Sequence, residues 1–476
     1  MAVYIAACFD PGSGKEDTEA GATATGATDA STSSAAPGST GEASSTTVFG
    51  STTDPTQDES ESTSADESRE EDATGSSSSS GSETRGEDSS ESSDGGQPWV
   101  PTSPPVENGQ AADLVLGQPD FATLVGGAGD TQFDSAGGLA SDGEHLWVMD
   151  LGNHRVVQFN AQPVVNEPRA DVAVGQESLR ESIVGPDALH LAEPEGSTGY
   201  YARAQIGDVS IGGGRLVVVD GANRILSWDT IPAASGLPWD LVLGQTTPTG
   251  AAPGTNASSL SSPEGVWTDG ERIVVADTQN HRVLIWSSIP DANGAPANLV
   301  LGQADFVSAE NPSPPTARSM NAPSDVFFDG ERLFVSDKGN HRVMVWSGFP
   351  ATNNAPADYI IGQTSPNTGE PNAGAGTNRR NAIGLEVPSE LVVAYGSLFI
   401  CDRGRVVVHT PVPSTSGEMA DAVLGEADLE GTPLDDPDQA IEPRGIAVFG
   451  DKLFVSHSNE ANGTSRVMRY QLHELP

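Results

Sequence analysis

The sequence predicts an all-β protein: a six-bladed β-propeller with four-stranded blades, preceded by a disordered N-terminal arm. Three observations lead to this prediction. The composition changes sharply near residue 110, and two short motifs alternate six times after that point. The apolar runs between turns are short, continuous and rich in β-branched residues, as in buried strands. We place the arm at residues 1–110 and the propeller at residues 111–476.

The arm is acidic and poor in apolar residues. Of the 67 acidic and 23 basic residues of the chain, 21 and 3 lie in residues 1–110, so the arm carries −18 and the remainder −26 of the total −44. Such a segment buries too little apolar surface to offset the entropy of ordering, and its like charges extend it. Because both parts are acidic and contain no Lys/Arg cluster, we expect no nucleic-acid partner.

A cysteine near the start of the chain indicates a lipid anchor. Residues 5–8 read Ile-Ala-Ala-Cys and resemble the lipobox of bacterial lipoproteins, in which the cysteine, here Cys8, is lipidated. Seven residues are too few for a signal peptide, so we expect the printed sequence to begin inside a longer one. The alternative is a chance cysteine at a frayed terminus. We therefore expect an extracytoplasmic protein, secreted or attached to a bacterial membrane through lipid alone, since no run of about 20 apolar residues occurs.

Two motifs alternate along the propeller. The first is an apolar strand that ends in Gly-Gln or, in the last copy, Gly-Glu, with glycines at 117, 175, 244, 302, 362 and 425. The second is a pair of strands joined by an Asp-x-x-Asn-His-Arg turn. Its full copies are Asp150, Asn153, His154 and Arg155; Asp277, Asn280, His281 and Arg282; and Asp337, Asn340, His341 and Arg342. Degenerate copies begin at Asp220, Asp402 and Ser456, so that six of each motif predict six blades.

Each repeat divides into four strands. In the third repeat these are residues 263–268, 272–276, 282–286 and 298–301, from the axis outward. One such sheet cannot bury both of its faces alone, so the sheets must stack around an axis. The chain begins with an isolated outermost motif at 114–118 and ends with a core motif that lacks one. We therefore expect the N-terminal strand to complete the sixth blade beside residues 467–470.

The Asp-x-x-Asn-His-Arg turn, preceded by Pro-x-Gly/Asp-Val, resembles the signature of NHL repeats over essentially all of residues 111–476. The first, third and fourth copies match closely. The second lacks His, the fifth lacks Asn and His, and the sixth is rebuilt around Ser456. The resemblance implies a mainly structural turn, in which the Asp accepts hydrogen bonds from the turn backbone and pairs with the Arg.

Carboxylates recur where the innermost strands begin. The residues before the first apolar position are Gly138, Asp208, Gly265, Asp325, Glu390 and Gly445. We expect Asp208, Asp325 and Glu390, with the adjacent Glu264, to converge on the channel mouth, where they could hold a hard cation such as Ca²⁺. Gluconolactonase-like and paraoxonase-like propeller enzymes use a metal in this way. The alternative is a set of solvated strand starts. No histidine falls on an innermost strand, unlike in the zinc-dependent peptidyl-hydroxyglycine lyases.

Long, dissimilar loops offer a second kind of site. Residues 177–204, 246–262, 304–322 and 364–387 connect outermost to innermost strands and are rich in Gly, Pro and Asn. Loops of this kind on a rigid ring build binding surfaces; the alternative is neutral drift of tolerated insertions. The candidate ligand-binding residues on this face are Tyr200, Tyr201, Arg379, Arg380 and Arg444.

Two functions follow from these features. The first is a monomeric, non-enzymatic binding or scaffold propeller that recognises a protein, peptide or glycan with its loops. The second is a metal-dependent hydrolase or lyase with Asp208, Asp325 and Glu390 as cation ligands. A cytoplasmic interaction protein is a third hypothesis if Cys8 is incidental. The sequence assigns no catalytic residue.

Overall fold

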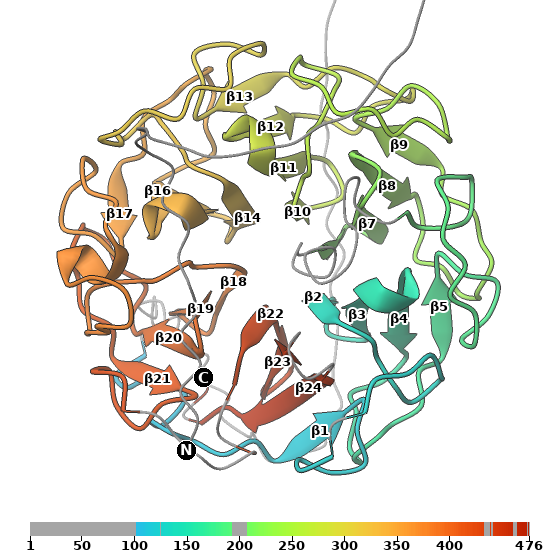
Figure 1. Cartoon of the computed structure of the whole chain (residues 1–476), viewed down its shortest axis with the longest axis horizontal. Coiled ribbons are helices and arrows are strands. Elements are labelled where there is room, and N and C mark those ends of the chain that lie inside the picture. Colours follow the sequence, from blue (N-terminus) through green and yellow to red (C-terminus); the bar gives the residue numbers. More distant parts are fainter. Residues whose placement is uncertain are drawn as a thin grey trace, which may run out of the picture. The chain divides into compact units, whose positions relative to one another are not determined.

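The computed structural model describes residues 101–123, 125–192, 207–432, 438, 441–459, 464–473 and 475 of the chain. Its strands form six four-stranded antiparallel sheets arranged around a central axis as the blades of a propeller (Figure 1). This arrangement confirms the predicted fold class and the predicted number of blades. The predicted sites at Cys8, Tyr200 and Tyr201, and the arm up to residue 100, lie outside the described residues.

Each blade is a meander of four strands, which we call A to D from the axis outward. Blades 1 to 5 are β2–β5, β6–β9, β10–β13, β14–β17 and β18–β21, and blade 6 is β22–β24 completed by β1. The strands are β1 (Leu114–Leu116), β2 (Ala136–Ser141), β3 (Leu146–Asp150), β4 (Arg155–Phe159), β5 (Val172–Val174), β6 (Val209–Gly212), β7 (Arg215–Asp220), β8 (Arg224–Trp228), β9 (Leu241–Leu243), β10 (Gly265–Thr268), β11 (Ile273–Asp277), β12 (Arg282–Trp286), β13 (Leu299–Leu301), β14 (Pro323–Phe328), β15 (Leu333–Asp337), β16 (Arg342–Trp346), β17 (Tyr359–Ile361), β18 (Leu391–Ala394), β19 (Ser397–Asp402), β20 (Arg405–His409), β21 (Ala422–Leu424), β22 (Pro443–Phe449), β23 (Lys452–Asn459) and β24 (Thr464–Gln471).

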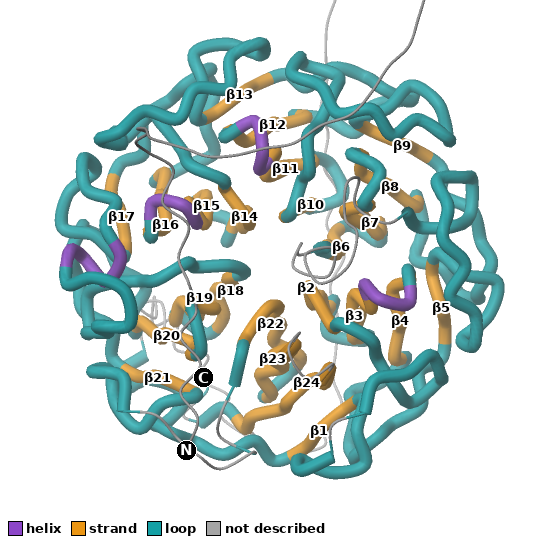
Figure 2. Tube along the Cα trace, in the orientation of Figure 1, coloured by secondary structure: helices purple, strands orange, loops and turns teal. Residues whose placement is uncertain are grey.

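Helical structure is confined to short 3₁₀ turns in the described part of the chain (Figure 2). These turns are η1 (Leu151–Asn153), η3 (Thr278–Asn280), η4 (Lys338–Asn340) and η5 (Pro371–Gly374). The first three lie within the Asp-x-x-Asn-His-Arg turns. Among the described residues, no helix has the length and apolar character needed to span a bilayer.

The N-terminal strand closes the ring as the sequence predicts. β1 pairs antiparallel with β24, so that Leu114, Val115 and Leu116 lie opposite Arg469, Met468 and Val467. Val115 and Leu116 are fully buried. The chain just before β1 also contacts blade 5, since the amide of Gly109 donates to the carbonyl of Val423 at 3.1 Å. The first and last parts of the described chain are thereby joined.

The cores lie between blades. One cluster combines Val274 and Ile285 of blade 3 with Val335 and Met344 of blade 4, and all four are fully buried. Because a neighbouring blade covers each face of a B or C strand, both faces are apolar. This is the physical reason for the continuous apolar runs in the sequence.

The glycine of each Gly-Gln or Gly-Glu motif is required by the turn that follows the D strand. All six have φ between +84° and +88°, a region that residues with a Cβ rarely adopt. The loop that follows also packs against this position. A Cβ on Gly117 would lie 2.4 Å from the Phe133 ring, and a Cβ on Gly175 would lie 2.6 Å from Leu191.

The meander places the connections on two faces. The loop face carries the turns between B and C strands and the long D-to-A connections, whose described parts are residues 117–123, 125–135, 175–192, 207–208, 244–264, 302–322, 362–390, 425–432, 438 and 441–442. The hairpin face carries the A-to-B turns and the C-to-D connections.

Candidate functional site

Blades 1 to 5 each contain a fully buried Asp–Arg pair at the B-to-C turn. In blade 3, Asp277 Oδ2 accepts hydrogen bonds from Asn280 at 2.8 Å and from Arg282 Nε at 2.7 Å. Its Oδ1 accepts one from the amide of Ser261 at 2.7 Å. Burial raises the pKa of Asp277 to about 6 because desolvation outweighs the attraction of Arg282. The other pairs are Asp150–Arg155, Asp220–Arg224, Asp337–Arg342 and Asp402–Arg405.

The histidine of the turn occupies a left-handed backbone conformation. φ is +50° at His154, +52° at His281 and +53° at His341. Two of the rings also hold the backbone before the next A strand: His281 Nδ1 accepts from the Ala322 amide at 3.0 Å, and His341 Nδ1 accepts from the Val387 amide at 3.2 Å. These contacts give both histidines a structural task at the loop face.

The degenerate turns preserve this conformation with other residues. Asn223 in blade 2 and Gly404 in blade 5 precede the turn arginine, with φ of +54° and +72°. Asn and Gly are the residues that tolerate a left-handed conformation best. Asn223 therefore occupies the position of the histidine rather than that of the motif asparagine, a substitution that the sequence pattern alone did not reveal.

Each turn arginine also fastens loops to one another. Arg342 Nη2 donates to the carbonyls of Thr316 and Ser319 at 2.9 Å each, and Nη1 donates to the carbonyl of Pro366 at 2.6 Å. These carbonyls belong to the connections before and after blade 4, so one buried guanidinium holds two consecutive loops. Equivalent bonds are made by Arg155, Arg224, Arg282 and Arg405.

The glutamine of the Gly-Gln motif holds the same loops from the outer side. Gln303 Nε2 donates to the carbonyls of His281 at 2.9 Å and Glu310 at 2.8 Å, and its Oε1 accepts from the Glu310 amide at 2.9 Å. Gln176 and Gln363 donate to the corresponding carbonyls in blades 1 and 4. The two recurring motifs therefore fix the backbone of the loop face.

Arg380, a predicted ligand-binding residue, takes part in this scaffold. The last copy of the motif carries Glu426, which cannot donate a hydrogen bond when ionised. Arg380 forms an ion pair with Glu426 and donates to the carbonyl of Arg403. This carbonyl lies one residue before the position that the glutamine reaches in the other blades, so Arg380 holds the same turn through a neighbouring carbonyl. The neighbouring Arg379 is exposed on the loop face, and Arg444 lies half-buried on β22.

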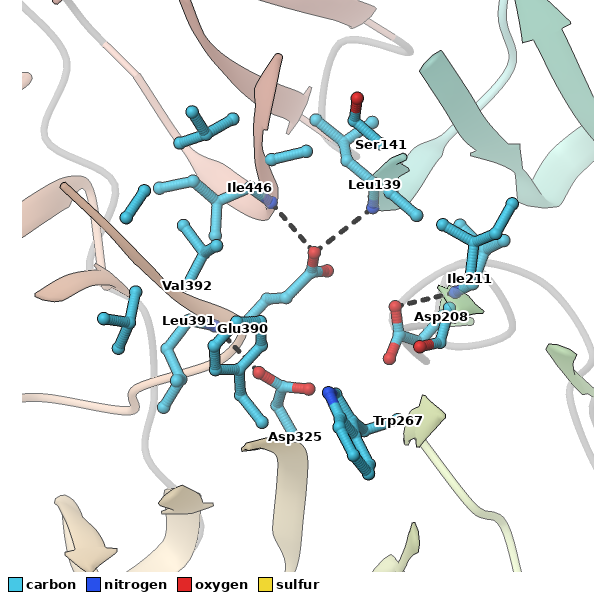
Figure 3. Close-up of a pocket in the computed structure, with 18 of the residues that line it drawn as sticks. Leu139, Ser141, Asp208, Ile211, Trp267, Asp325, Glu390, Leu391, Val392 and Ile446 are labelled. Carbon is cyan, nitrogen blue, oxygen red and sulfur yellow. Dashed lines mark hydrogen bonds between the residues drawn. The ribbon is translucent and has the colours of Figure 1, made fainter. Parts of the chain in front are cut away.

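The structure brings Asp208, Asp325 and Glu390 together in an axial pocket of about 400 Å³ (Figure 3). They are 4%, 4% and 5% exposed. The pocket extends from these carboxylates along the A strands to Tyr395 and Gly450 in the A-to-B turns. It therefore reaches the hairpin face, at the opposite end of the A strands from the loops.

The three carboxylates connect the A strands of different blades. Asp208 Oδ2 accepts from the amide of Val266, and Asp325 Oδ2 accepts from the amide of Leu391, both at 2.8 Å. Glu390 Oε1 accepts from Leu139 at 3.2 Å and from Ile446 at 3.0 Å. Every blade thus gives or receives at least one of these bonds, which satisfy strand amides that face the axis.

Two of the glycines at the starts of the A strands make room for these contacts. A Cβ on Gly138 would lie 2.5 Å from Asp208 Oδ1 and 3.1 Å from Glu390 Oε2. A Cβ on Gly265 would lie 2.6 Å from the Cα of Asp325. The A strands approach one another so closely at the axis that a small residue must face each acidic one.

Burial dominates the electrostatics of this ring of carboxylates. It raises the pKa of Asp325 to about 7. Burial, with repulsion from Asp325, raises the pKa of Asp208 well above its usual value, and burial with repulsion from Asp208 and Asp325 does the same for Glu390. Glu390 Oε2 is buried without a hydrogen-bond partner among the described residues.

Glu264, the fourth predicted cation ligand, lies apart from this ring. Its carboxylate forms an ion pair with Lys338 of the next blade at 2.5 Å, and it does not line the axial pocket. Within the described ranges, no three His, Cys, Asp or Glu side chains are arranged so that they could hold a metal ion.

Comparisons with known proteins find similarity only among solved structures, since no protein-family model and no curated protein matches the chain. The PQQ-bound aldose sugar dehydrogenase of Streptomyces coelicolor is 15% identical over 75% of this chain and 100% of that one, with a TM-score of 0.40. The WD40 propeller domain of Doa1 is 11% identical over 77% and 97%, with a TM-score of 0.36. A chain of a mitotic checkpoint complex is 11% identical over 80% and 100%, with a TM-score of 0.38. These similarities are too distant to bear on function.

Proposed function

We propose that the chain is a non-enzymatic binding or scaffold propeller that recognises a protein, peptide or glycan with its loop face. The observation that carries this proposal is the set of buried turn arginines. Each holds the main chain of two consecutive loops, as Arg342 does through Thr316, Ser319 and Pro366. Loops held in this way lose little conformational freedom when a partner binds, and binding is stronger by that amount.

Exposed apolar side chains on the same face support the proposal. Val125 is 51% exposed, Ile183 and Val184 are 48% exposed, and Val307 is 70% exposed. All four lie in the D-to-A connections of the loop face. Apolar groups on a rigid surface contribute binding energy to a partner without a cost of ordering. The acidic surface favours a neutral or basic partner over a nucleic acid.

We further propose that the repeats are of the NHL type and that the propeller works outside the bacterial cytoplasm, attached through a lipid on Cys8 and a flexible acidic arm. The support for the first proposal is the structural use of Asp277, Asn280, His281 and Arg282 at one turn. The support for the second is the Ile-Ala-Ala-Cys sequence followed by the acidic spacer. Mass spectrometry of the N-terminal peptide and membrane fractionation of Cys8→Ser test the anchor.

The metal-dependent hydrolase or lyase is the less favoured function. Asp208, Asp325 and Glu390 do converge, but they accept six hydrogen bonds from main-chain amides, including those of Val209 and Val326. These bonds leave too few oxygens for the full set of ligands that a hard cation requires.

The test compares three full-length baits: the natural chain, Val307→Asp on the loop face, and Met419→Asp on the hairpin face. Val307 and Met419 are 70% and 65% exposed, so neither change should disturb folding. A partner is captured by cross-linking, identified, and titrated against each bait. We expect about a tenfold or greater loss of affinity for Val307→Asp and an unchanged affinity for Met419→Asp. Equal affinities of both variants, or a loss confined to Met419→Asp, would contradict use of the loop face.

A further inference from the structure

The axial pocket combines apolar walls with an acidic end. Its walls are formed largely by A-strand side chains, among them Val209, Val266, Trp267, Val326, Val392 and Ile446. Its inner end is formed by the three carboxylates of Asp208, Asp325 and Glu390. A volume of about 400 Å³ is that of a small-molecule site.

Among the residues that the structure describes, the carboxylates have no cationic partner in the pocket. No Lys, Arg or His is among its lining residues, as far as the described part of the chain shows. Their bonds to main-chain amides leave Glu390 Oε2 without a partner in the described part of the chain, although Glu390 is only 5% exposed (Figure 3). A buried carboxylate oxygen without a hydrogen bond is costly to keep ionised, and burial with repulsion from Asp208 and Asp325 raises the pKa of Glu390. A cationic donor at this oxygen would stabilise the ionised form.

The position of this oxygen restricts the donor. Glu390 Oε2 and Asp208 Oδ1 both lie near Gly138, 3.1 and 2.5 Å from the point where its Cβ would be, so the two oxygens are close to one another. Charge-assisted hydrogen bonds span about 2.8 Å, so one small cationic group can reach both oxygens. An ammonium group supplies such donors and needs few acceptors, whereas Ca²⁺ requires about 6 to 8 oxygen ligands.

We propose that the axial pocket binds an organic cation that joins an ammonium group to a hydrocarbon body. The ammonium group donates to Glu390 Oε2 and Asp208 at the inner end. The hydrocarbon body lies along the valine and isoleucine walls, with the Trp267 ring beside it, and the ligand enters from the hairpin face. This site is independent of the proposed loop-face function, because the pocket opens on the hairpin face, whereas that function uses the exposed side chains of the loops.

The experiment uses the full chain with three probes of equal length: hexylamine, hexanol and hexanoate. Isothermal titration calorimetry and thermal unfolding are measured for the natural chain, for Glu390→Gln and for Glu271→Gln. Gln at 390 keeps the Oε1 acceptor for Leu139 and Ile446 and replaces only the unpartnered oxygen by an amide. Glu271 is an exposed carboxylate, so its variant controls for the loss of one negative charge.

We expect hexylamine to bind the natural chain and the Glu271→Gln variant at least tenfold more tightly than hexanol, with no binding of hexanoate. Glu390→Gln should weaken hexylamine binding about tenfold or more, because a hydrogen bond to a charged group is lost. Equal binding of hexylamine and hexanol would overturn the proposal in favour of a purely apolar pocket. Stoichiometric Ca²⁺ binding that Glu390→Gln abolishes, with no response to hexylamine, would overturn it in favour of a metal site.

Discussion

Raising the pH from 5 to 8 should destabilise the propeller through the carboxylates at its axis. Burial raises the pKa of Asp325 to about 7, against 3.8 for an ordinary Asp. Between these values the folded state binds a proton that the unfolded state has already lost. The stabilisation from this group is therefore complete at low pH and disappears as the pH rises through 7. Asp208 and Glu390, whose pKa values burial also raises, act in the same direction.

The structure sets the size of the effect. With a folded pKa of about 7, Asp325 alone should lower the free energy of unfolding by about 2 to 3 kcal/mol between pH 5 and pH 8. The assay is urea unfolding followed by tryptophan fluorescence at both pH values. It is run on the natural chain, on Asp325→Asn and on Asp291→Asn, in which an exposed carboxylate is removed. Asp325→Asn is expected to be less stable at pH 5, because asparagine cannot accept from both the Val326 and Leu391 amides, and to show a weaker dependence on pH.

Two results would refute this reasoning. One is a free energy of unfolding that stays constant or increases from pH 5 to pH 8 in the natural chain. The other is an equal loss in the natural chain and in Asp325→Asn, which would assign the titration to other groups. Asp291→Asn should follow the natural chain at both pH values.

Three further predictions concern the scaffold. Leu116→Ala in the closing strand should lower the free energy of unfolding, measured in urea, by about 2 to 5 kcal/mol, because the side chain is fully buried. Leu237→Ala should change this free energy little, because Leu237 is exposed. Equal effects of the two variants would count against closure by β1. Gly138→Ala should lower the free energy of unfolding by about 1 to 3 kcal/mol, because the added Cβ would meet Asp208. Thermal unfolding measures this loss, and Gly348→Ala is the control because a Cβ there meets open space. Arg342→Met should lower the free energy of unfolding by about 3 to 5 kcal/mol and speed amide hydrogen exchange in residues 303–322 and 363–390. Arg379→Met, at an exposed position, should have neither effect. Unchanged exchange in Arg342→Met would show that the guanidinium does not hold the loops.

Repetition made the fold readable from the sequence. The Gly-Gln motif predicts the strand end because only glycine adopts the φ of +84° found at Gly117 and Gly302. The Asp277-to-Arg282 turn predicts the link between the second and third strands, and the unpaired motif at 114–118 predicts the closure by β1. These features depend on residues close together in the chain, or on counting copies of a motif.

The loop scaffold could be predicted only in part. The pairing of Asp337 with Arg342 follows from the motif. The further bonds from Arg342 to Thr316 and Pro366 do not, because they join connections that precede and follow the blade. The ion pair of Arg380 with Glu426 was equally hidden, since it depends on a Gln-to-Glu change 46 residues away in the chain.

The sequence by itself determined the architecture and the fact that Asp208, Asp325 and Glu390 begin equivalent strands, because a repeat puts equivalent residues at one depth in a ring. Only the tertiary structure decided their surroundings. The A strands approach one another so closely that the three carboxylates are buried and accept hydrogen bonds from neighbouring amides, while Glu390 Oε2 has no donor among the described residues. Burial and hydrogen bonding between blades are properties of the assembled ring, and no single repeat carries them.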